Sequence, residues 1–393
     1  MQRALSFLGF FGVATLVVVG LHWYLWSRLV RAPGWPAPWS KVGTWALVFL
    51  AVLLPVAMPL SRALPRDWAG PIAGAAYAWM GLGFLLVVSA FLADLASWIG
   101  SGALALWASR QSEGATDPVR RELLSRGAAG VASVAAVGFG GAALRGGLGE
   151  VEVKEVPVRL ERLPRALSGF SLVQLTDVHV GPTIGRRFVE QIVEKANAQR
   201  PDAVVITGDL VDGSVAELAR HVEPLARLRA RHGVYFCLGN HEYYSGAAPW
   251  IEHLRSLGIR VLRNERVVVG DAAASFDLAG VDDYKAGRFG HEPDLAAAVA
   301  GRDPERELVL LAHQPAEIER AARHAVGLQL SGHTHGGQIR PFDNLVKLAQ
   351  PYVRGLHRHG PHTQIYVSCG TGYWGPPMRL GAPAEVTKVV LTT

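Results

Sequence analysis

The N-terminal 150 residues contain three apolar runs, each close to the length that crosses the hydrocarbon core of a bilayer. They lie at about Ala4–Trp26, Val42–Leu60 and Ile72–Leu95, and short basic loops separate them. A helix needs about 20 apolar residues to cross roughly 30 Å of hydrocarbon, more than most buried helices of soluble proteins contain. A removable signal peptide would explain the first run but not the two that follow. The sequence therefore predicts an α-helical transmembrane region.

A fourth run, Gly127–Leu144, is uncharged but rich in glycine and alanine, so it either spans the membrane or serves as a linker. It follows the basic stretch Arg120–Arg126. The pattern Arg-Arg-x-Leu-Leu-x-Arg in this stretch resembles a twin-arginine export signal placed inside the chain. An ordinary cytoplasmic basic loop explains the same stretch equally well.

The distribution of basic residues favours one orientation, because cytoplasmic loops carry an excess of Lys and Arg. The first and third loops hold Arg28, Arg31, Lys41, Arg110, Arg120, Arg121 and Arg126, against Arg3, Arg62 and Arg66 on the other side. With four spans the C-terminal domain lies outside the cytoplasm, whereas with three spans it stays inside. We expect a multi-pass protein of the cell membrane with an extracytoplasmic C-terminal domain.

Composition narrows the range of partners. Half of the residues are hydrophobic, and the formal net charge is +6. Such a charge suits nucleic acid or anionic lipid, but much of the Lys and Arg lies between the apolar runs, so we expect the membrane and no nucleic acid as partner. Cys237 and Cys369, the two cysteines, lie in apolar strand-like runs and provide neither a disulfide framework nor a cysteine zinc site.

From about Val151 the sequence changes to short β-rich runs that alternate with charged helical stretches, such as Phe188–Ala198 and Val215–Arg231. This alternation is typical of an α/β domain. We therefore expect two regions, a transmembrane region over residues 1–150 and an α/β domain over residues 151–393.

Side chains that commonly bind metals follow five short apolar strands of this second region. Asp177 and His179 follow Ser171–Thr176, Asp209 and Asp212 follow Ala203–Thr207, Asn240, His241 and Glu242 follow Val234–Leu238, His313 follows Leu308–Ala312, and His333 and His335 follow Leu328–Ser331. In α/β sheets ligands gather beyond the carboxyl ends of the strands, so these clusters are expected to converge. Carboxylate, imidazole and amide groups suit two divalent ions such as Mn, Fe or Zn.

Three glycines stand directly after strands in these clusters, at Gly208, Gly239 and Gly332. Glycine permits sharp turns and a close approach of two backbones, which bulkier residues would prevent. We expect these glycines to bring the polar side chains together.

The order Asp-x-His, Gly-Asp, Gly-Asn-His-Glu, His and Gly-His-x-His resembles that of the calcineurin-like metallophosphoesterases, from about Val151 to the C-terminus. The form Gly-His-Thr-His-Gly-Gly-Gln, together with Arg379–Pro383 and Glu385, is similar to the membrane-associated bacterial branch of that family. The resemblance implies a four-layer α-β-β-α sandwich that hydrolyses phosphoester or pyrophosphate bonds with two metal ions.

The resemblance also implies a role for each residue. One ion would be held by Asp177, His179 and His335, the second by Asn240, His313 and His333, and both by a bridging Asp209. His241 would contact the phosphoryl group and protonate or stabilise the leaving oxygen. Glu242, which stands in place of the family's common aspartate, would orient the imidazole of His241. Two ions ~3.5–4 Å apart lower the pKa of bound water and neutralise charge on the phosphate.

The membrane region indicates a phosphorylated, lipid-linked small-molecule substrate. Hydrolysis of UDP-2,3-diacylglucosamine in lipid A synthesis is one activity that the resemblance implies. That substrate is cytoplasmic, so four spans would favour cell-wall or phospholipid phosphoesters instead. A non-catalytic metal-binding interaction module on the same scaffold is the alternative, and loss of ligands would be its sign. A transporter or sensor is disfavoured, because the spans lack paired charges and Asp94 lies near one end.

Three further groups are expected to stay outside the site. We expect a solvated loop for His357, His359 and His362, a turn for Asp282 and Asp283, and core packing for Tyr373 and Trp374.

Overall fold

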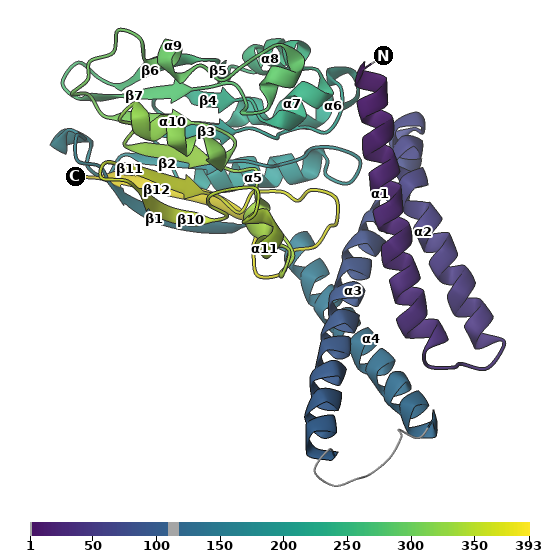
Figure 1. The fold of residues 1–393 in the computed structure, drawn as a ribbon. Coiled ribbons are helices and arrows are strands. Elements are labelled where there is room, and N and C mark those ends of the chain that lie inside the picture. Colours follow the sequence, from purple (N-terminus) through teal and green to yellow (C-terminus); the bar gives the residue numbers. More distant parts are fainter. Residues whose placement is uncertain (1, 109–117) are drawn as a thin grey trace. The chain divides into compact units, whose positions relative to one another are not determined.

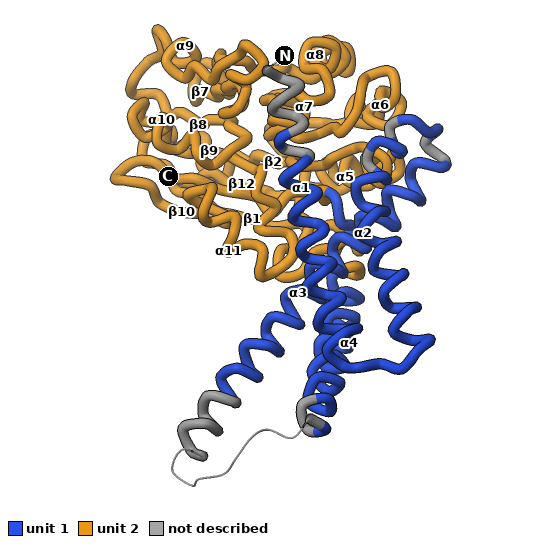
Figure 2. The backbone as a smooth tube through the Cα atoms, turned by 45° about the vertical axis from the view of Figure 1, so that its right-hand side comes forward, with its two compact units in different colours: residues 1–143, 375–377 blue, residues 144–374, 378–393 orange. Residues whose placement is uncertain are grey.

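The computed structural model describes residues 2–108 and 118–393, which form two compact units (Figure 2). Unit 1 comprises residues 1–143 with Gly375–Pro377, and unit 2 comprises residues 144–374 and 378–393. Arg110, one of the basic residues used to predict orientation, lies outside the described residues.

Unit 1 is built from long apolar helices. They are α1 (Gln2–Trp26), α2 (Trp39–Ala63), α3 (Arg66–Ala108) and α4 (Pro118–Leu148), with a π-helical segment, Ser27–Arg31, after α1 (Figure 1). Four stretches in the described residues are long and apolar enough to cross a membrane, namely Gly12–Arg31, Trp39–Ala57, Trp68–Gly100 and Glu122–Leu148. The fourth apolar run is therefore a helix of spanning length rather than an extended linker.

The small residues of α4 form a packing face. Ala132 and Ala136 are buried, and so is Ala143 one to two turns later. Gly140 lies so close to α3 that a Cβ atom on it would come within 3.1 Å of a methyl group of Leu82. Small residues allow helices to approach closely where lipid offers no hydrophobic drive to associate. The weak hydropathy of this run thus reflects close helix packing.

Asp94 of α3 is paired, contrary to the expectation that the spans lack such pairs. Its carboxylate lies 2.8 Å from Nε of Arg28 and accepts a hydrogen bond of 2.7 Å from the hydroxyl of Tyr24. Ionisable side chains in spanning helices are costly unless they are paired. The pair joins the end of α1 to α3, which gives Asp94 a structural role.

Unit 2 contains two six-stranded sheets, ordered β1-β12-β2-β3-β4-β5 and β10-β11-β9-β8-β7-β6. The strands are β1 (Glu152–Arg159), β2 (Ser171–Leu175), β3 (Ala203–Thr207), β4 (Val234–Cys237), β5 (Arg260–Val261), β6 (Glu265–Gly270), β7 (Ser275–Gly280), β8 (Leu308–Leu311), β9 (Leu328–Ser331), β10 (Gly355–His359), β11 (Thr363–Val367) and β12 (Glu385–Thr392). Strands β2 to β5 run parallel, as do β7, β8, β9 and β11. The five strands predicted to precede the polar clusters are β2, β3, β4, β8 and β9.

Helices flank both sheets (Figure 1). The helices of unit 2 are α5 (Arg186–Ala198), α6 (Val215–Val222), α7 (Asn240–Ser245), α8 (Ala247–Ser256), α9 (Leu295–Val299), α10 (Ile318–Arg323) and α11 (Asp343–Val346), with short 3-10 turns at Arg165–Leu167, Glu223–Arg227, Ala286–Phe289, Pro315–Glu317 and His335–Gly337. The predicted helix Val215–Arg231 ends early, at Val222, because Pro224 cannot continue the α-helical hydrogen bonding.

Three apolar cores separate these layers. Along β3, Val204 faces the helices α5, α6 and α8, whereas Val205 faces the second sheet, since successive strand residues point to opposite faces. Along β8, Val309 faces the first sheet and Leu310 faces α9 and α10. Unit 2 is therefore the predicted four-layer α-β-β-α sandwich.

Candidate metal centre

The polar clusters meet at one edge of the two sheets, beyond the carboxyl ends of the five strands. Among the described residues, three sets of side chains have ligand atoms that all lie within 4.8 Å of one another. One is His179, Asp212 and His241, and the other two consist of predicted metal ligands alone. The first of these two sets is Asp177, His179 and His335, and the second is Asp209, His313 and His333. Each of these two sets draws on both sheets, so only the packed sandwich brings its members together.

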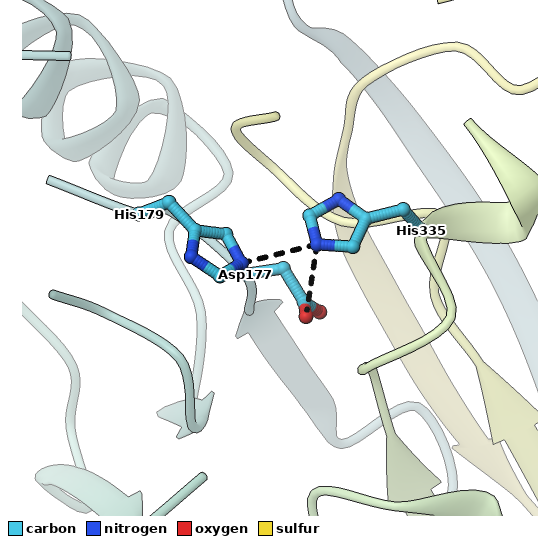
Figure 3. Close-up of side chains that lie close together, drawn as sticks. All are labelled: Asp177, His179 and His335. Atoms are coloured by element: carbon cyan, nitrogen blue, oxygen red, sulfur yellow. Dashed lines mark hydrogen bonds and ion pairs between the residues drawn. The ribbon is translucent and has the colours of Figure 1, made fainter. Parts of the chain in front are cut away.

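The first set surrounds a single point (Figure 3). The Nε2 atoms of His179 and His335 lie 3.0 Å apart, and Nε2 of His335 lies 3.5 Å from Oδ1 of Asp177. The other carboxylate interactions of Asp177 fix its orientation, because its oxygens accept hydrogen bonds of 2.9 and 3.0 Å from the backbone N–H of His333. Three electron-pair donors thus face one another in a buried site.

Asp209 belongs to the second set and also lies near a histidine of the first. Its Oδ2 atom is 3.0 Å from Nε2 of His313 and 3.9 Å from Nε2 of His179. The ring of His313 is oriented by a hydrogen bond of 2.7 Å between its Nδ1 and the carbonyl oxygen of Thr207. Because a carbonyl oxygen only accepts, Nδ1 donates, and Nε2 is the nitrogen that a cation would take in place of a proton. Burial opposes a proton on this ring, but Asp209 outweighs it and raises the pKa of His313 well above its usual range. This position of Asp209 is the one that a bridging ligand requires.

The donor atoms fit divalent cations. Among the described residues, Oδ1 of Asn240 and Nε2 of His313 are buried and form no hydrogen bond of regular geometry, although Nε2 of His313 faces the Asp209 carboxylate at 3.0 Å. Leaving a buried polar atom unsatisfied costs on the order of 1–3 kcal/mol. Cations at the two sets would satisfy both atoms, and the mixture of carboxylate, imidazole and amide oxygen suits Mn, Fe or Zn.

The backbone is strained at the same place. Five of the seven predicted ligands adopt a positive φ, namely Asp177 (51°), His179 (53°), Asp209 (50°), His333 (71°) and His335 (50°). Such conformations are unfavourable for residues other than glycine and are concentrated at functional sites. These backbone conformations lower the stability of the fold, and they direct the five side chains toward one volume.

Two of the predicted glycines are required by close contacts. A Cβ atom on Gly239 would lie 2.2 Å from Oδ1 of Asp209, and one on Gly332 would lie 2.1 Å from Oδ2 of Asp177. Any side chain at either position would displace a predicted metal ligand. The expectation that these glycines allow close approach is confirmed.

The carboxylate that orients His241 is Asp212, so the expectation for Glu242 is wrong. Asp212 Oδ1 contacts Nδ1 of His241, and its Oδ2 lies 3.1 Å from Nδ1 of His179. Glu242 instead accepts hydrogen bonds of 2.7 to 3.3 Å from backbone N–H groups, those of Asp209, Leu210, Val211 and Gly239. Because α7 turns the side chain of Glu242 back under its own N-terminus, Glu242 holds the loop of Asp209 rather than the imidazole.

The pKa values of the histidines differ according to their surroundings. Burial lowers the pKa of His333 to about 3, and burial together with His179 and Arg379 holds that of His335 well below its usual range. For His241, burial opposes the charged form, but Asp209 and Asp212 outweigh it and raise the pKa to about 9. Neutral imidazoles are the forms that bind metals, whereas a protonated His241 can donate a proton.

Exposed aromatic rings surround His241. Tyr244 and Trp374 lie 5.3 and 6.0 Å from the His241 ring between centroids, and Phe289 lies 5.7 Å from Tyr244. Trp374 is 51% exposed, so the expectation of core packing is wrong for Trp374, although Tyr373 is buried. We call Tyr244, Phe289 and Trp374 the aromatic rim.

The Gly-Gly-Gln segment after His335 holds Trp374 in place. The side-chain amide of Gln338 donates to the carbonyl of Trp374 at 3.0 Å, and its Oε1 accepts from the N–H of Trp374 at 3.0 Å. The residues of one metal-binding loop therefore position a residue of the rim. No sequence pattern indicated this pairing.

Arg379 joins the loops behind His335. It is buried and donates to the carbonyl oxygens of Gly372 and Ala382, at 3.0 and 2.9 Å, and an Nη atom lies 3.5 Å from Nδ1 of His335. Burial lowers its pKa to about 10. Arg379, the first residue of the Arg379–Pro383 motif, therefore holds the loop after β11 against His335 of the first ligand set.

One further expectation is corrected in part. His357 and His359 belong to strand β10 rather than to a solvated loop, because their segment pairs with β11, whereas His362 lies in the exposed turn. Asp282 and Asp283 begin a turn, as expected, since the N–H of Ala286 bonds to the carbonyl of Asp283 at 2.9 Å, and their side chains are buried and paired. Asp282 binds Arg263 at 2.7 Å, and Asp283 accepts a hydrogen bond of 2.9 Å from Gln314, the residue next to His313.

Comparison with known proteins finds metallophosphoesterases among the similar sequences. The model of the calcineurin-like phosphoesterase family matches residues 170–337. The chain is 44% identical over 247 residues to an uncharacterized metallophosphoesterase of Helicobacter pylori, covering 62% of this chain and 65% of that protein. It is 38% identical over 326 residues to the Bos taurus transmembrane protein with metallophosphoesterase domain, covering 80% and 73%. Among solved structures, the 5'-nucleotidase precursor of Thermus thermophilus matches with a TM-score of 0.32 and 15% identity, over 57% of this chain and 54% of that one.

The sandwich and its paired ligand sets define a metallophosphoesterase domain. The chain belongs to the calcineurin-like phosphoesterase family, which its sequence motifs predicted. It spans 65% of the length of the Helicobacter relative, so family membership alone does not fix the activity of the whole protein.

Proposed function

We propose that the chain is a membrane-anchored hydrolase that uses two divalent metal ions to cleave phosphoester or pyrophosphate bonds. The observation that carries the proposal is the position of Asp209, which belongs to one set of buried donors and also lies near a histidine of the other. Asp177, His179 and His335 would hold one ion, and Asn240, His313 and His333 the second. Bound ions of this kind lower the pKa of water and neutralise charge on phosphoryl oxygens.

His241 is the residue that would serve the leaving group. Asp212 binds its Nδ1, and its Nε2 lies 3.9 Å from Oδ2 of Asp209, so the free nitrogen faces the ligand sets. The raised pKa keeps this nitrogen protonated at neutral pH, and the proton can pass to the departing oxygen. Asp212 fixes the ring and stabilises its charge throughout.

The aromatic rim supports a substrate whose leaving part is apolar. Tyr244 and Trp374 flank His241, the residue assigned to the leaving oxygen, so the departing group would lie against exposed rings. Together with the spanning helices of unit 1, the rim supports a lipid-linked phosphoester. A domain outside the cytoplasm would act on cell-wall or phospholipid phosphoesters, and a cytoplasmic domain on UDP-2,3-diacylglucosamine.

Metal analysis and a substrate screen of the purified full chain test the proposal. We expect about two transition-metal equivalents per chain and loss of hydrolysis on treatment with chelator, restored by adding metal. The screen would compare phosphomonoesters, phosphodiesters and nucleotide-lipid pyrophosphates. Bound metals without turnover of any of these substrates would instead indicate a non-catalytic interaction module.

A further inference from the structure

Unit 2 exposes a row of large apolar side chains at α11, close to the predicted metal ligands in the chain. Phe342, Leu345 and Leu348 are 45%, 56% and 84% exposed. They are spaced three residues apart, and the backbone N–H groups of Leu345 and Leu348 bond to the carbonyls of Phe342 and Leu345 at 2.9 and 3.1 Å. Side chains at this spacing lie on one face when i to i+3 bonds connect them. We call these three residues the α11 face.

The α11 face is attached to the loop of His335. A Cβ atom on Gly337 would lie 2.4 Å from Cβ of Asp343, so the start of α11 packs directly against the Gly-Gly segment. Asp343 is also buried, and one of its oxygens lies 3.9 Å from an Nη atom of Arg354. The helix is therefore fixed to the metal-binding edge of unit 2 while its apolar face points outward.

Basic residues flank the α11 face. Arg340 and Lys347 are both exposed, one just before Phe342 and the other between Leu345 and Leu348. Apolar side chains beside Lys or Arg are the combination that binds the interface of an anionic bilayer, where the rings and methyl groups enter the acyl boundary and the cations contact headgroups. Unit 2 is also tethered near lipid, because α4 is of membrane-spanning length and leads directly into the first strand of unit 2.

We propose that the α11 face docks on the surface of the bilayer in which the helices of unit 1 are embedded. This contact goes beyond the proposed hydrolysis and would hold the His335 loop at the lipid surface. The surface bound by the α11 face is an anionic bilayer. The exposed leucines match its acyl boundary, and Lys347 matches its negatively charged headgroups. The docking itself requires neither bound metals nor turnover.

Fluorescence quenching in the full chain tests the docking. A probe on Ala349→Cys would report on the turn that follows Leu348, and Cys237 and Cys369 are buried and should not compete for the label. The chain would be reconstituted in vesicles of phosphatidylethanolamine and phosphatidylglycerol that contain phosphatidylcholine spin-labelled near the headgroup. The same probe on Val268→Cys, in edge strand β6, is the matched control. Val268 is also exposed, but the residues beside it on the same face of β6 are Arg266 and Gly270, which are not large apolar side chains.

We expect the spin-labelled lipid to quench the probe at position 349 and to leave the probe at position 268 unquenched. Leu345→Ser combined with Leu348→Ser should weaken docking on the order of tenfold or more, because burial of each leucine contributes substantially to partitioning. Lys347→Glu should weaken docking about fivefold with phosphatidylglycerol and leave it unchanged in neutral vesicles. Metal content equal to that of the unmodified chain would show that these variants are folded.

Equal quenching at both positions would overturn the proposal, and so would a probe at position 349 that stays in water. An effect of lipid charge that Lys347→Glu does not change would also contradict it. Because quenching needs no turnover, a chain that docks without hydrolysing any phosphoester would refute the proposed function alone.

Discussion

The imidazole of His241 depends on a carboxylate 29 residues away in the sequence. Asp212 binds the Nδ1 of His241, and the same carboxylate reaches His179 of the first ligand set. A single side chain therefore couples the residue assigned to the leaving group with a predicted metal ligand. Two predictions at the level of single residues concern His241 itself, and a third concerns Asp209.

The pH dependence of turnover should follow the pKa of His241. The pKa is raised to about 9, so the protonated ring is present below that pH and is lost as the pH rises through it. We expect kcat to fall at alkaline pH. Asp212→Asn removes one of the charges that raise the pKa and should move the alkaline limb to lower pH. Measurement of kcat against pH for both proteins checks this, and an unmoved limb in Asp212→Asn would show that another group titrates.

Replacing His241 with alanine should separate metal binding from catalysis. His241 is assigned to the leaving oxygen, so His241→Ala should retain both metals while kcat falls by roughly 10²–10⁴-fold. Metal analysis and steady-state kinetics measure the two effects, and His362→Ala, an exposed histidine beside Glu161, is the matched control. Metal loss in His241→Ala would make this residue a ligand.

Asp209→Ala should have the opposite effect. One carboxylate is proposed to serve both ions, and its Oδ2 lies near histidines of both sets. We expect metal occupancy of both sites to collapse, with activity lost as a consequence. Elemental analysis of the purified variant checks the result, with circular dichroism to confirm its fold. A variant that still binds two equivalents would rule out the bridging role.

At the level of elements, the loops after β9 and β11 are joined by Arg379 and Gln338. Arg379 donates to the carbonyls of Gly372 and Ala382 within the loop after β11 and, at 3.5 Å, to the carbonyl of His335 in the loop after β9. Gln338 forms two hydrogen bonds with the backbone of Trp374. These contacts hold the first ligand set and the aromatic rim in a single arrangement.

Arg379→Met should destabilise the first ligand set. It leaves buried carbonyl oxygens without donors, at a cost on the order of 1–3 kcal/mol each, so we expect a lower unfolding midpoint and weaker metal binding. Arg379→Lys keeps the charge but not the planar fork and should recover only part of both. Thermal unfolding and metal titration measure the changes. Full metal affinity in Arg379→Met would show that metal binding does not depend on Arg379.

Trp374→Ala should change substrate preference rather than metal content. Removing the ring takes away apolar surface beside His241, so KM should rise on the order of tenfold for a phosphoester with an apolar leaving group. The KM for a small polar phosphoester should stay nearly constant. Kinetics with both substrates decide the matter, and Tyr284→Ala provides a control at an exposed aromatic outside the rim. Equal changes for the two substrates would argue against a leaving-group contact.

At the level of the whole molecule, the number of spans decides which side of the membrane the site faces. Four helices of spanning length place the C-terminal domain outside the cytoplasm if all of them cross. The twin-arginine-like stretch, Arg120–Arg126, lies in the first turns of α4. Its resemblance to an export signal agrees with export, because that route carries folded proteins and would let the domain acquire its metals first.

Reporter fusions after Thr393 test this topology. One reporter should work only in the cytoplasm and the other only outside it. We expect the signal from the outside reporter alone. A cytoplasmic signal would refute export and restore UDP-2,3-diacylglucosamine as the proposed substrate.

Features that depend on local patterns could be predicted from the amino-acid sequence. Apolar length predicts the helices of unit 1, and short β-rich runs predict β2, β3, β4, β8 and β9, because hydropathy and residue type act over a few neighbouring residues. The ligand types follow these strands directly, so their convergence at one sheet edge could also be predicted.

Which polar groups meet could not be predicted in the same way. Asp212 rather than Glu242 orients His241, Trp374 is exposed rather than buried, and His357 and His359 lie in a strand. The first two outcomes depend on contacts between segments about 30 residues or more apart in the chain, such as Asp212 with His241 and Gln338 with Trp374, whereas His357 and His359 lie in a local hairpin, because β10 pairs with β11 across a short turn. A side chain's partner is set by the packing of two sheets and their loops, and residue type and spacing do not encode that geometry locally.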